Sequence, residues 1–355
     1  FQAEDGIRDS ETWLEFRRVL FRSNQTPPDE NRVLLIDGLN LFFRNFAVLN
    51  YINPHGTHVG GLGGFIRSLG ALVRQIKPTS IYIVFDGVGS TMNRKNLLPE
   101  YKSGRNTTKI TKHLFDNIDE ENESKADQIG RLIHYLQCLP VKILSMDKVE
   151  ADDIIAFLSV ELTKNEKTKA FIVSSDKDFL QLVNENVTVY SAMEKEFYTP
   201  QAVKNKFNIQ PYNFIIYKTL MGDGSDKIAG VKGLGPKKLN KMFPELLGTE
   251  KLSLDDIFKI CEEKHDKHVI YSQVIFDFDD LKKSYKVMDL SNPILDDKEK
   301  DLILNHIKSF AYKLDIPTFI KLYNEDGLGN ILKNIEFWLR DNWTTIDRYN
   351  KAKNK

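Results

Sequence analysis

Acidic residues follow three short apolar segments of the chain. The segments and the acids after them are 33–36 with Asp37, 81–85 with Asp86, and 170–173 with Asp176 and Asp178. Apolar runs of this length are typical of buried strands in a parallel sheet. Parallel strands end at one edge of the sheet, where open α/β sheets form their sites. The negative charges of these carboxylates would repel each other strongly at one edge unless cations offset them. The pattern therefore predicts a metal site.

A second acidic group, Glu150-Ala-Asp-Asp153, precedes an apolar pattern of helical spacing through Leu162. Glu150, Asp152 and Asp153 should therefore lie at the N-terminal end of an amphipathic helix. An acidic first turn also complements the helix dipole, so these three residues alone fit an ordinary helix start equally well. Together with Asp176 and Asp178, five carboxylates within 29 residues stand where elements begin or end, which favours the metal site.

A third group combines acids with a basic, glycine-rich turn. Asp223 and Asp226 precede the segment 227–241, which contains five lysines and no acid. Backbone amides at the start of a helix, together with lysines, bind a phosphodiester backbone without reading its bases. The segment therefore predicts a nucleic-acid contact, with an ordinary surface turn as the alternative.

Composition limits the class of protein. With 355 residues and 41% hydrophobic content, the chain can bury a large core and should divide into two domains. Fifty basic residues balance fifty acidic ones, so a polyanion must be bound by local patches. Cys138 and Cys261 are widely spaced within apolar helical patterns, which argues against a disulfide framework or zinc site and for a reducing compartment. No apolar run reaches the length of a membrane span.

Strands and helices alternate along the chain, which predicts an α/β fold with a mostly parallel sheet. The expected strands are 32–37, 81–85, 141–144, 170–173 and 187–190. The expected helices are one through 65–76, one at 126–139, one after Glu150, one at 179–183, one at 200–207 and one from Pro211 to Gly222. The glycine-rich run 56–64 lacks the spacing of a nucleotide-binding loop, so we expect it to allow close packing or close approach to a ligand.

The long connection after the second strand separates its charges. Residues 94–112 carry six basic side chains against one acidic, and residues 115–127 carry six acidic against one basic. A connection of this length inside a compact domain is usually functional or disordered. A solvated loop with two unlike charge blocks is the alternative.

Residues 1–23 do not match the pattern of the rest of the chain. They resemble a translated sequencing-adapter fragment and are excluded from the fold, with a native amphipathic helix as the alternative. Residues 24–31, with Pro27 and Pro28, are expected to form a linker.

Six blocks together resemble the 5′-nuclease family, which includes the 5′→3′ exonuclease domain of bacterial DNA polymerase I, phage 5′-exonucleases and flap endonucleases. They are Asp37-Gly38, Phe85-Asp86 with Arg94, 101–105, 150–153, 174–182, and 222–226 through 233–238. The resemblance is collinear from 32 to 245. It implies a PIN-like nuclease core over 32–210 with an arch at 92–124. It also implies a helix-hairpin-helix-type (helix-3-turn-helix) DNA-binding region over 211–300 and a helical C-terminal extension over 301–355.

The resemblance also implies the site. Two Mg²⁺ ions, which Mn²⁺ can replace, would be held by nine carboxylates: Asp37, Asp86, Glu150, Asp152, Asp153, Asp176, Asp178, Asp223 and Asp226. Arg94 and Lys102 would support catalysis near the scissile phosphate. DNA would be bound by Tyr101, which would stack on a base, and by Arg105, Lys232, Gly233, Gly235, Lys237, Lys238 and Lys241. A K⁺ ion would sit at the helix-3-turn-helix.

The implied substrate is DNA with a 5′ flap, a nick or a single-stranded 5′ end, with RNA·DNA hybrids as a further candidate. We expect a free-standing monomer in the cytoplasm of a bacterial or phage-infected cell, with replication proteins as candidate partners.

Two other interpretations of the motifs remain at this point. A haloacid-dehalogenase-like phosphatase also places Asp-x-Asp after a strand, but it leaves Asp37, Asp86 and Glu150 unexplained. A structure-specific DNA-binding protein with weak or no catalysis would keep the lysine-rich turn, although all nine carboxylates are present.

Overall fold

The computed structural model describes residues 30–104, 109–111, 113–309, 313–329, 331–332 and 334–353. The adapter-like segment 1–23 and most of the expected linker 24–31 lie outside these residues. Asn31 already belongs to the sheet, because it pairs with Thr168.

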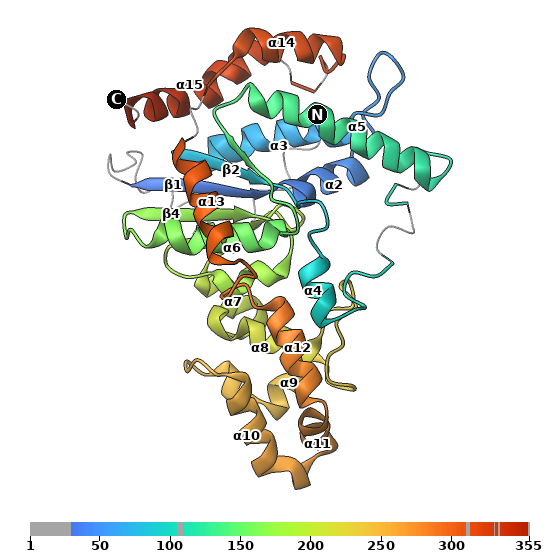
Figure 1. Ribbon diagram of the computed structural model, residues 1–355, viewed down its shortest axis with the longest axis vertical. Coiled ribbons are helices and arrows are strands. Elements are labelled where there is room, and N and C mark those ends of the chain that lie inside the picture. Colours follow the sequence, from blue (N-terminus) through green and yellow to red (C-terminus); the bar gives the residue numbers. More distant parts are fainter. Residues whose placement is uncertain are drawn as a thin grey trace.

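The centre of the protein is a six-stranded sheet in the order β3-β2-β1-β4-β5-β6 (Figure 1). The strands are β1 (Asn31–Asp37), β2 (Ser80–Val84), β3 (Lys142–Leu144), β4 (Thr168–Val173), β5 (Val187–Ser191) and β6 (Glu196–Tyr198). All neighbouring pairs are parallel except β5 with β6. This confirms the mostly parallel α/β fold. The antiparallel strand β6 was not expected, because its sequence Glu-Phe-Tyr contains no apolar run like those of the other strands.

Side chains of β1 alternate between two cores, because successive residues of a strand point to opposite faces. Leu34 and Ile36 face one core, and Val33 and Leu35 face the other. All four are at most 4% exposed. The sheet is therefore covered on both sides, as its near-continuous apolar strands require.

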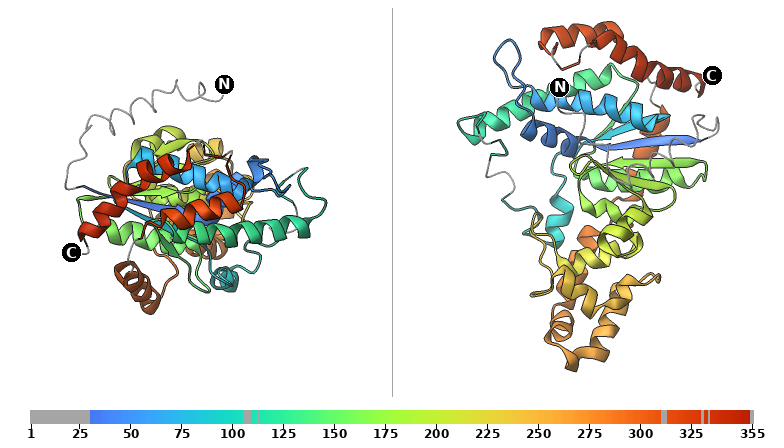
Figure 2. Two further views of the ribbon diagram at one scale, coloured as in Figure 1. Left: turned by 90° about the horizontal axis from the view of Figure 1, so that it is seen from above. Right: turned by 180° about the vertical axis from the view of Figure 1, so that it is seen from behind.

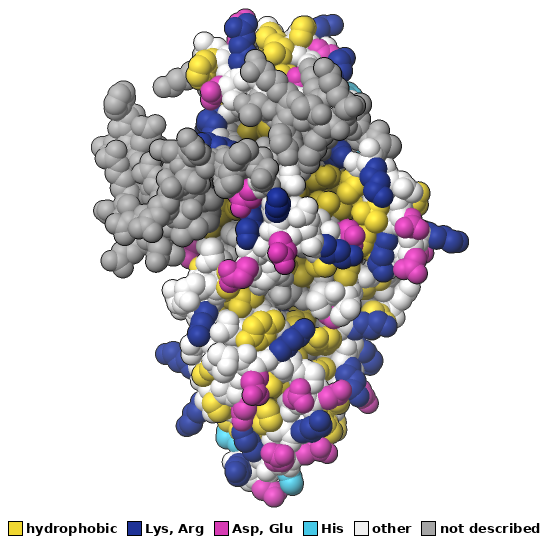
Figure 3. Space-filling view, turned by 90° about the vertical axis from the view of Figure 1, so that its left-hand side faces the viewer, with side chains coloured by type: hydrophobic (Ala, Val, Ile, Leu, Met, Phe, Trp, Pro, Cys, Tyr) yellow, Lys and Arg dark blue, Asp and Glu magenta, His cyan; other side chains and the backbone are white. Residues whose placement is uncertain are grey.

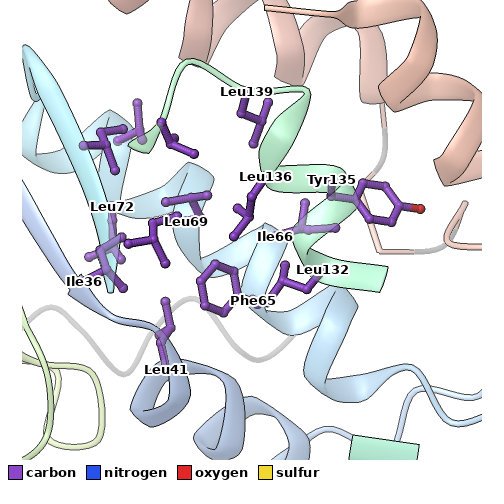
Figure 4. Packing of buried hydrophobic residues seen from close by; sticks show 14 of the residues in the cluster. Ile36, Leu41, Phe65, Ile66, Leu69, Leu72, Leu132, Tyr135, Leu136 and Leu139 are labelled. Atoms are coloured by element: carbon purple, nitrogen blue, oxygen red, sulfur yellow. The ribbon is translucent and has the colours of Figure 1, made fainter. Parts of the chain in front are cut away.

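Five helices build the first core (Figure 1, Figure 4). They are α2 (Gly38–Val48), α3 (Gly60–Ile76), α5 (Ile118–Gln137), α14 (Ile316–Glu325) and α15 (Ile335–Lys353). The glycines at the start of α3 bring it close to α2. A Cβ atom on Gly61 would lie 2.6 Å from the Phe42 ring. This confirms that the glycine-rich run serves close packing.

The second core lies on the other face of the sheet. Its elements include α6 (Ala151–Thr163), the 3-10 helix η2 (Lys177–Leu182), α7 (Pro200–Phe207), α8 (Phe214–Met221) and α13 (Asp297–Ser309). The short 3-10 helix η3 (Pro211–Asn213) connects α7 to α8. Thr199 caps α7 by accepting a hydrogen bond from the N–H of Ala202, and Pro200 occupies the first turn, as expected. The helix expected at 179–183 is the 3-10 helix η2.

A helical unit extends away from the sheet, at the end of the molecule remote from α14 and α15 (Figure 1, Figure 2). It contains α9 (Pro236–Met242), η4 (Pro244–Leu247), α10 (Leu254–Lys264), η5 (His265–Lys267), α11 (Val269–Phe276) and α12 (Phe278–Met288). Its separate apolar core includes Leu239, Phe243 and Ile257, each fully buried.

The described part of the connection after β2 contains helical segments that its charges did not predict. It contains α4 (Met92–Leu97), and α5 begins at Ile118 rather than near Ala126. The expected start was wrong because the acidic block forms the first turns of the helix, where it complements the dipole. Asn117 caps this helix by accepting a hydrogen bond from the N–H of Glu120. Arg105 lies outside the described residues.

None of the helices in the described part of the chain combines the length and apolarity needed to cross a membrane.

Candidate metal centre

Three carboxylates lie at the carboxyl ends of β1, β2 and β4, as the sequence predicted. Asp37 accepts hydrogen bonds from the N–H of Asn40 at 3.0 Å and from Ser174 Oγ at 3.1 Å. Asp86 Oδ1 accepts the N–H of Ala151 at 2.7 Å. It therefore ties the end of β2 to the start of α6. Asp176 caps η2 by accepting the N–H of Asp178 at 2.8 Å. Each carboxylate is thus fixed by the start of the element that follows a strand.

The electrostatics of this edge show that the carboxylates act on one another. Burial raises the pKa of Asp37 to about 7, and the charges of Asp86 and Asp176 add to this effect. Burial also raises the pKa of Asp152, again with Asp176 and Asp37 as the neighbouring charges. Partial desolvation of the carboxylate raises the pKa of Asp86 as well, although the residue as a whole is exposed. Ionising any of these carboxyl groups here therefore costs free energy. A cation bound among them would offset that cost.

Two of the predicted metal ligands, Glu150 and Asp153, form ion pairs with basic side chains. Arg94 Nη1 lies 2.5 Å from both Glu150 Oε2 and Asp153 Oδ2, and Lys102 Nζ lies 2.5 Å from Glu150 Oε1. Glu150 and Asp153 are each 1% exposed. Burial of these carboxylates without partners would cost free energy, and the two basic residues offset that cost.

Lys218 is a site residue that the sequence analysis missed. Its Nζ lies 2.8 Å from Asp178 Oδ1 and 2.5 Å from Asp223 Oδ2. Burial and the charge of Asp176 raise the pKa of Asp178 to about 7, although Lys218 opposes this shift. The signal in the sequence was weak, because a single lysine in the apolar pattern of α8 looks like an ordinary exposed position. Lys218 is in fact largely buried, and it joins η2 to the segment after α8.

The nine predicted metal ligands differ in whether a basic side chain contacts them. In the part of the chain that the structure describes, no three His, Cys, Asp or Glu side chains stand close enough to hold one ion as they are. Glu150, Asp153, Asp178 and Asp223 form ion pairs with Arg94, Lys102 and Lys218. The inner acids Asp37, Asp86, Asp152 and Asp176 supply only oxygen donors, the ligands that hard divalent cations prefer. The raised pKa values of Asp37, Asp86 and Asp152 also fit a cation site.

Two expected roles do not fit the positions found. Tyr101 is 4% exposed, packs in the core of the helical unit and points its hydroxyl at Glu150, 3.2 Å from Oε2. Its ring therefore has no free face to stack on a base. Arg94 is 3% exposed, and its guanidinium is already shared between Glu150 and Asp153. Its three guanidinium nitrogens all donate to groups of the protein itself.

The lysine-rich turn is exposed and stands next to the acidic edge. Lys232, Lys237 and Lys241 are exposed, whereas Lys238 Nζ donates to the carbonyl oxygen of Gly233 at 3.3 Å. Gly233 has φ +79°, which an L side chain would strain, and Gly235 precedes the first residue of α9. The lysines therefore project from a turn whose backbone shape depends on glycine.

On the face shown in Figure 3, lysine and arginine are interspersed with acidic side chains over the lower part of the molecule. A nucleic acid would accordingly be held by local sets of lysines such as this turn. Asp226 is buried in the turn. Asp223 Oδ1 accepts the N–H of Ser225 at 2.8 Å. Hydrogen bonds of this kind shape the loop between α8 and α9.

Sequence comparison identifies relatives that match large parts of this chain. A family model for the 5′-3′ exonuclease N-terminal resolvase-like domain matches residues 32–208. The 5′-3′ exonuclease of Buchnera aphidicola is 32% identical over 209 residues, 58% of this chain and 68% of the relative. That of Aquifex aeolicus is 27% identical over 294 residues, 81% of this chain and 93% of the relative. DNA polymerase I of Bacillus subtilis is 32% identical over 237 residues, and the chain spans 25% of its length.

Solved structures share the fold. The T5 D15 protein co-crystallised with metal ions matches with a TM-score of 0.59 and 20% identity, covering 85% of this chain and 99% of that one. The catalytic core of Rad2 in complex with DNA matches with a TM-score of 0.51 and 15% identity, covering 86% and 91%. The family match places Asp37, Asp86 and Glu150 in one domain, so the haloacid-dehalogenase-like interpretation was wrong. The chain belongs to the 5′-nuclease family.

Proposed function

We propose that this chain hydrolyses phosphodiester bonds near the 5′ ends of DNA, as a metal-dependent 5′→3′ exonuclease and flap endonuclease. The observation that carries the proposal is the position of Asp37, Asp86, Asp152 and Asp176 at one sheet edge. Desolvation there raises the pKa of Asp37, Asp86 and Asp152, and the charge of Asp176 adds to the shifts of Asp37 and Asp152. A purely structural edge would not collect acids in this way, because each one costs stability. Membership of the 5′-nuclease family supports the same function.

The inner acids would hold two divalent ions, Mg²⁺ by preference, with Mn²⁺ as a substitute. When bound, such ions lower the pKa of an attacking water and offset charge on the phosphoryl and leaving oxygens. Glu150, Asp178, Asp223 and Asp226 would act around them, directly or through water. Their basic partners Lys102 and Lys218 would then be released in part. Lys102 would pair with the phosphate as charge develops on it.

The lysine-rich turn would hold the duplex next to the scissile bond. Lys232, Lys237, Lys238 and Lys241 would contact phosphates, and the N–H groups around Gly233 and Gly235 would add contacts that read no base. Backbone carbonyl oxygens of the turn would hold a K⁺ ion, which would add positive charge next to the duplex. Arg105 would contact the 5′ strand. The substrates would be flaps, nicks and single-stranded 5′ ends, including those of RNA·DNA hybrids, and the active species would be a monomer.

A flap-cleavage assay tests the proposal. A 5′-labelled DNA flap should be cut with Mg²⁺ or Mn²⁺ and not with EDTA. Asp176→Asn should nearly abolish cutting and leave binding to the flap in Ca²⁺ intact, because the lysines are untouched. The control is Asp147→Asn, an exposed acid before α6 that should behave as wild type. Tight flap binding without cutting by the wild-type protein would instead favour a DNA-binding protein that has lost catalysis.

A further inference from the structure

One buried guanidinium joins three elements that are far apart in the sequence. Arg94, on α4, bonds the carboxylates of Glu150 and Asp153 at the start of α6. Its Nε also donates to the carbonyl oxygen of Val287, near the end of α12, at 2.8 Å. Burial alone would lower the pKa of Arg94, but the charges of Asp153 and Glu150 outweigh it and raise the pKa above its ordinary value. The guanidinium is therefore permanently charged and fully engaged within the protein.

Asp153 has both carboxylate oxygens occupied. Oδ2 accepts Arg94 Nη1 at 2.5 Å, and Oδ1 accepts Arg94 Nη2 at 3.0 Å and the N–H of Ile294 at 2.9 Å. This is the two-pronged geometry in which arginine binds a carboxylate most strongly. The neighbouring Asp152 differs, since the charges that act on it are those of Asp176 and Asp37. The two adjacent acids of this motif therefore have different neighbours.

Residues 287–294, which are the end of α12 and the chain after it, are also bonded to η2. Gln181, on η2, donates from Nε2 to the carbonyl oxygen of Met288 at 2.9 Å and accepts the N–H of Leu290 at 3.0 Å. Residues 287–294 are thus bonded both to α6 and to η2, the two elements that begin at acids of the site. The stretch fixes the spacing between them.

We infer that Arg94 and Asp153 are a positioning pair, not a phosphate contact and a metal ligand. The pair locks the first turn of α6 against α4 and the 287–294 stretch, so that Asp152 and Glu150 are presented to the cations of the proposed nuclease site. The inference rests on that proposed function for its effect on catalysis. Its structural half, that Asp153 stabilises the fold and does not bind metal, stands without it.

The first test compares two adjacent and chemically identical changes. Asp153→Asn leaves Arg94 buried and partly unpaired, so it should lower the metal-free Tm by about 5 °C or more. It should keep the rise in Tm that Ca²⁺ or Mn²⁺ causes. Asp152→Asn should do the reverse. It should keep or raise the metal-free Tm because it removes a repelling charge, and it should lose most of the metal-induced rise. A Asp153→Asn protein with wild-type Tm and no response to metal would overturn the inference.

A second variant separates positioning from stability. Arg94→Met together with Asp153→Leu replaces the pair by apolar side chains of similar size, which buried pairs often tolerate without loss of stability. We expect a folded protein with a near wild-type Tm. The concentration of Mn²⁺ for half-maximal cleavage should rise roughly 10- to 100-fold, as for other residues that orient metal ligands. The Kd for a DNA flap in Ca²⁺ should change less than about threefold, because the residues that contact phosphate are unchanged.

The outcomes keep the two proposals apart. A folded double variant with wild-type metal dependence would show that the pair has no positioning role. A loss of flap affinity of about tenfold, with metal dependence unchanged, would make Arg94 a phosphate contact after all. If the wild-type protein neither cuts DNA nor responds to metal, the nuclease proposal fails, whereas the metal-free Tm values of Asp153→Asn and Asp152→Asn still decide the structural half.

Discussion

Lys102 donates its backbone N–H to the carbonyl oxygen of Asp226 at 2.9 Å. The residue has φ +52°, a conformation that costs a non-glycine residue free energy and that persists only where the surroundings impose it. The bond joins the segment after α4 to the start of the lysine-rich turn. If a duplex binds at the turn as proposed, this hydrogen bond would link it to Lys102, whose side chain lies at the acidic edge.

The first prediction follows from this position. Lys102→Ala should lower the single-turnover cleavage rate by roughly 100-fold and change the Kd for a flap in Ca²⁺ by less than about threefold, because the charge acts on the transition state more than on bound DNA. Lys95→Ala, at an exposed position of α4, serves as the control and should cut at the wild-type rate. A variant that binds tenfold more weakly and keeps its chemical rate would make Lys102 a plain phosphate contact.

The second prediction concerns Lys218. Lys218→Met should lower the metal-free Tm, since Asp178 and Asp223 would lose their shared cation and stay buried together. Ca²⁺ should restore more of the Tm in this variant than it adds to the wild type, because a divalent ion can replace the lost charge. Thermal melts with and without Ca²⁺ measure both effects, with Lys164→Met as an exposed control. Equal Ca²⁺ responses in variant and wild type would contradict the prediction.

The third prediction concerns the lysine-rich turn. Replacing Lys237 and Lys238 by Ala should weaken binding to every duplex-containing substrate alike and reduce the slope of log K against log salt by up to about two, one for each lost phosphate contact. The matched control is Lys164→Ala with Lys167→Ala. These two exposed lysines precede β4 and so lie at the opposite edge of the sheet from the acids. An unchanged salt slope in the turn variant would show that the turn faces away from DNA.

The fourth prediction is a pH dependence of stability. Burial would raise the pKa of Glu121, but hydrogen bonds from Lys125, Thr111 and the N–H of Ile110 outweigh it and lower the pKa to about 2. A lowered folded pKa stabilises the protein above the unfolded value, and that stabilisation is lost as pH falls from about 4.5 to about 2. The shift is worth up to about 3 kcal/mol.

The difference in unfolding free energy between wild type and Glu121→Gln should therefore be largest at pH 7 and shrink toward pH 2. Chemical denaturation across this range measures it, with the exposed Glu123→Gln as the control. A difference that stays constant with pH would mean that Glu121 keeps an ordinary pKa.

Several features of the site could be predicted from the sequence because they are local. Asp37, Asp86 and Asp176 follow apolar runs that could only be buried strands, and parallel strands bring their ends together whatever else the chain does. The cap at Thr199 and the end of α8 at Gly222 depend on neighbouring residues alone. The six motif blocks were sufficient to indicate the 5′-nuclease family for the same reason, since each is a short continuous segment.

The partners of the carboxylates were decided only by the tertiary structure. Lys218 looked like one lysine in an apolar helix, Arg94 looked available to a phosphate, and Tyr101 looked available to a base. Which cation neutralises which acid depends on how α4, α6, α8 and the stretch after α12 pack, over separations of up to 193 residues between Arg94 and Val287. Such pairings leave no periodic signal in the sequence, because a buried charge is set by the whole surface around it and not by its neighbours in the chain.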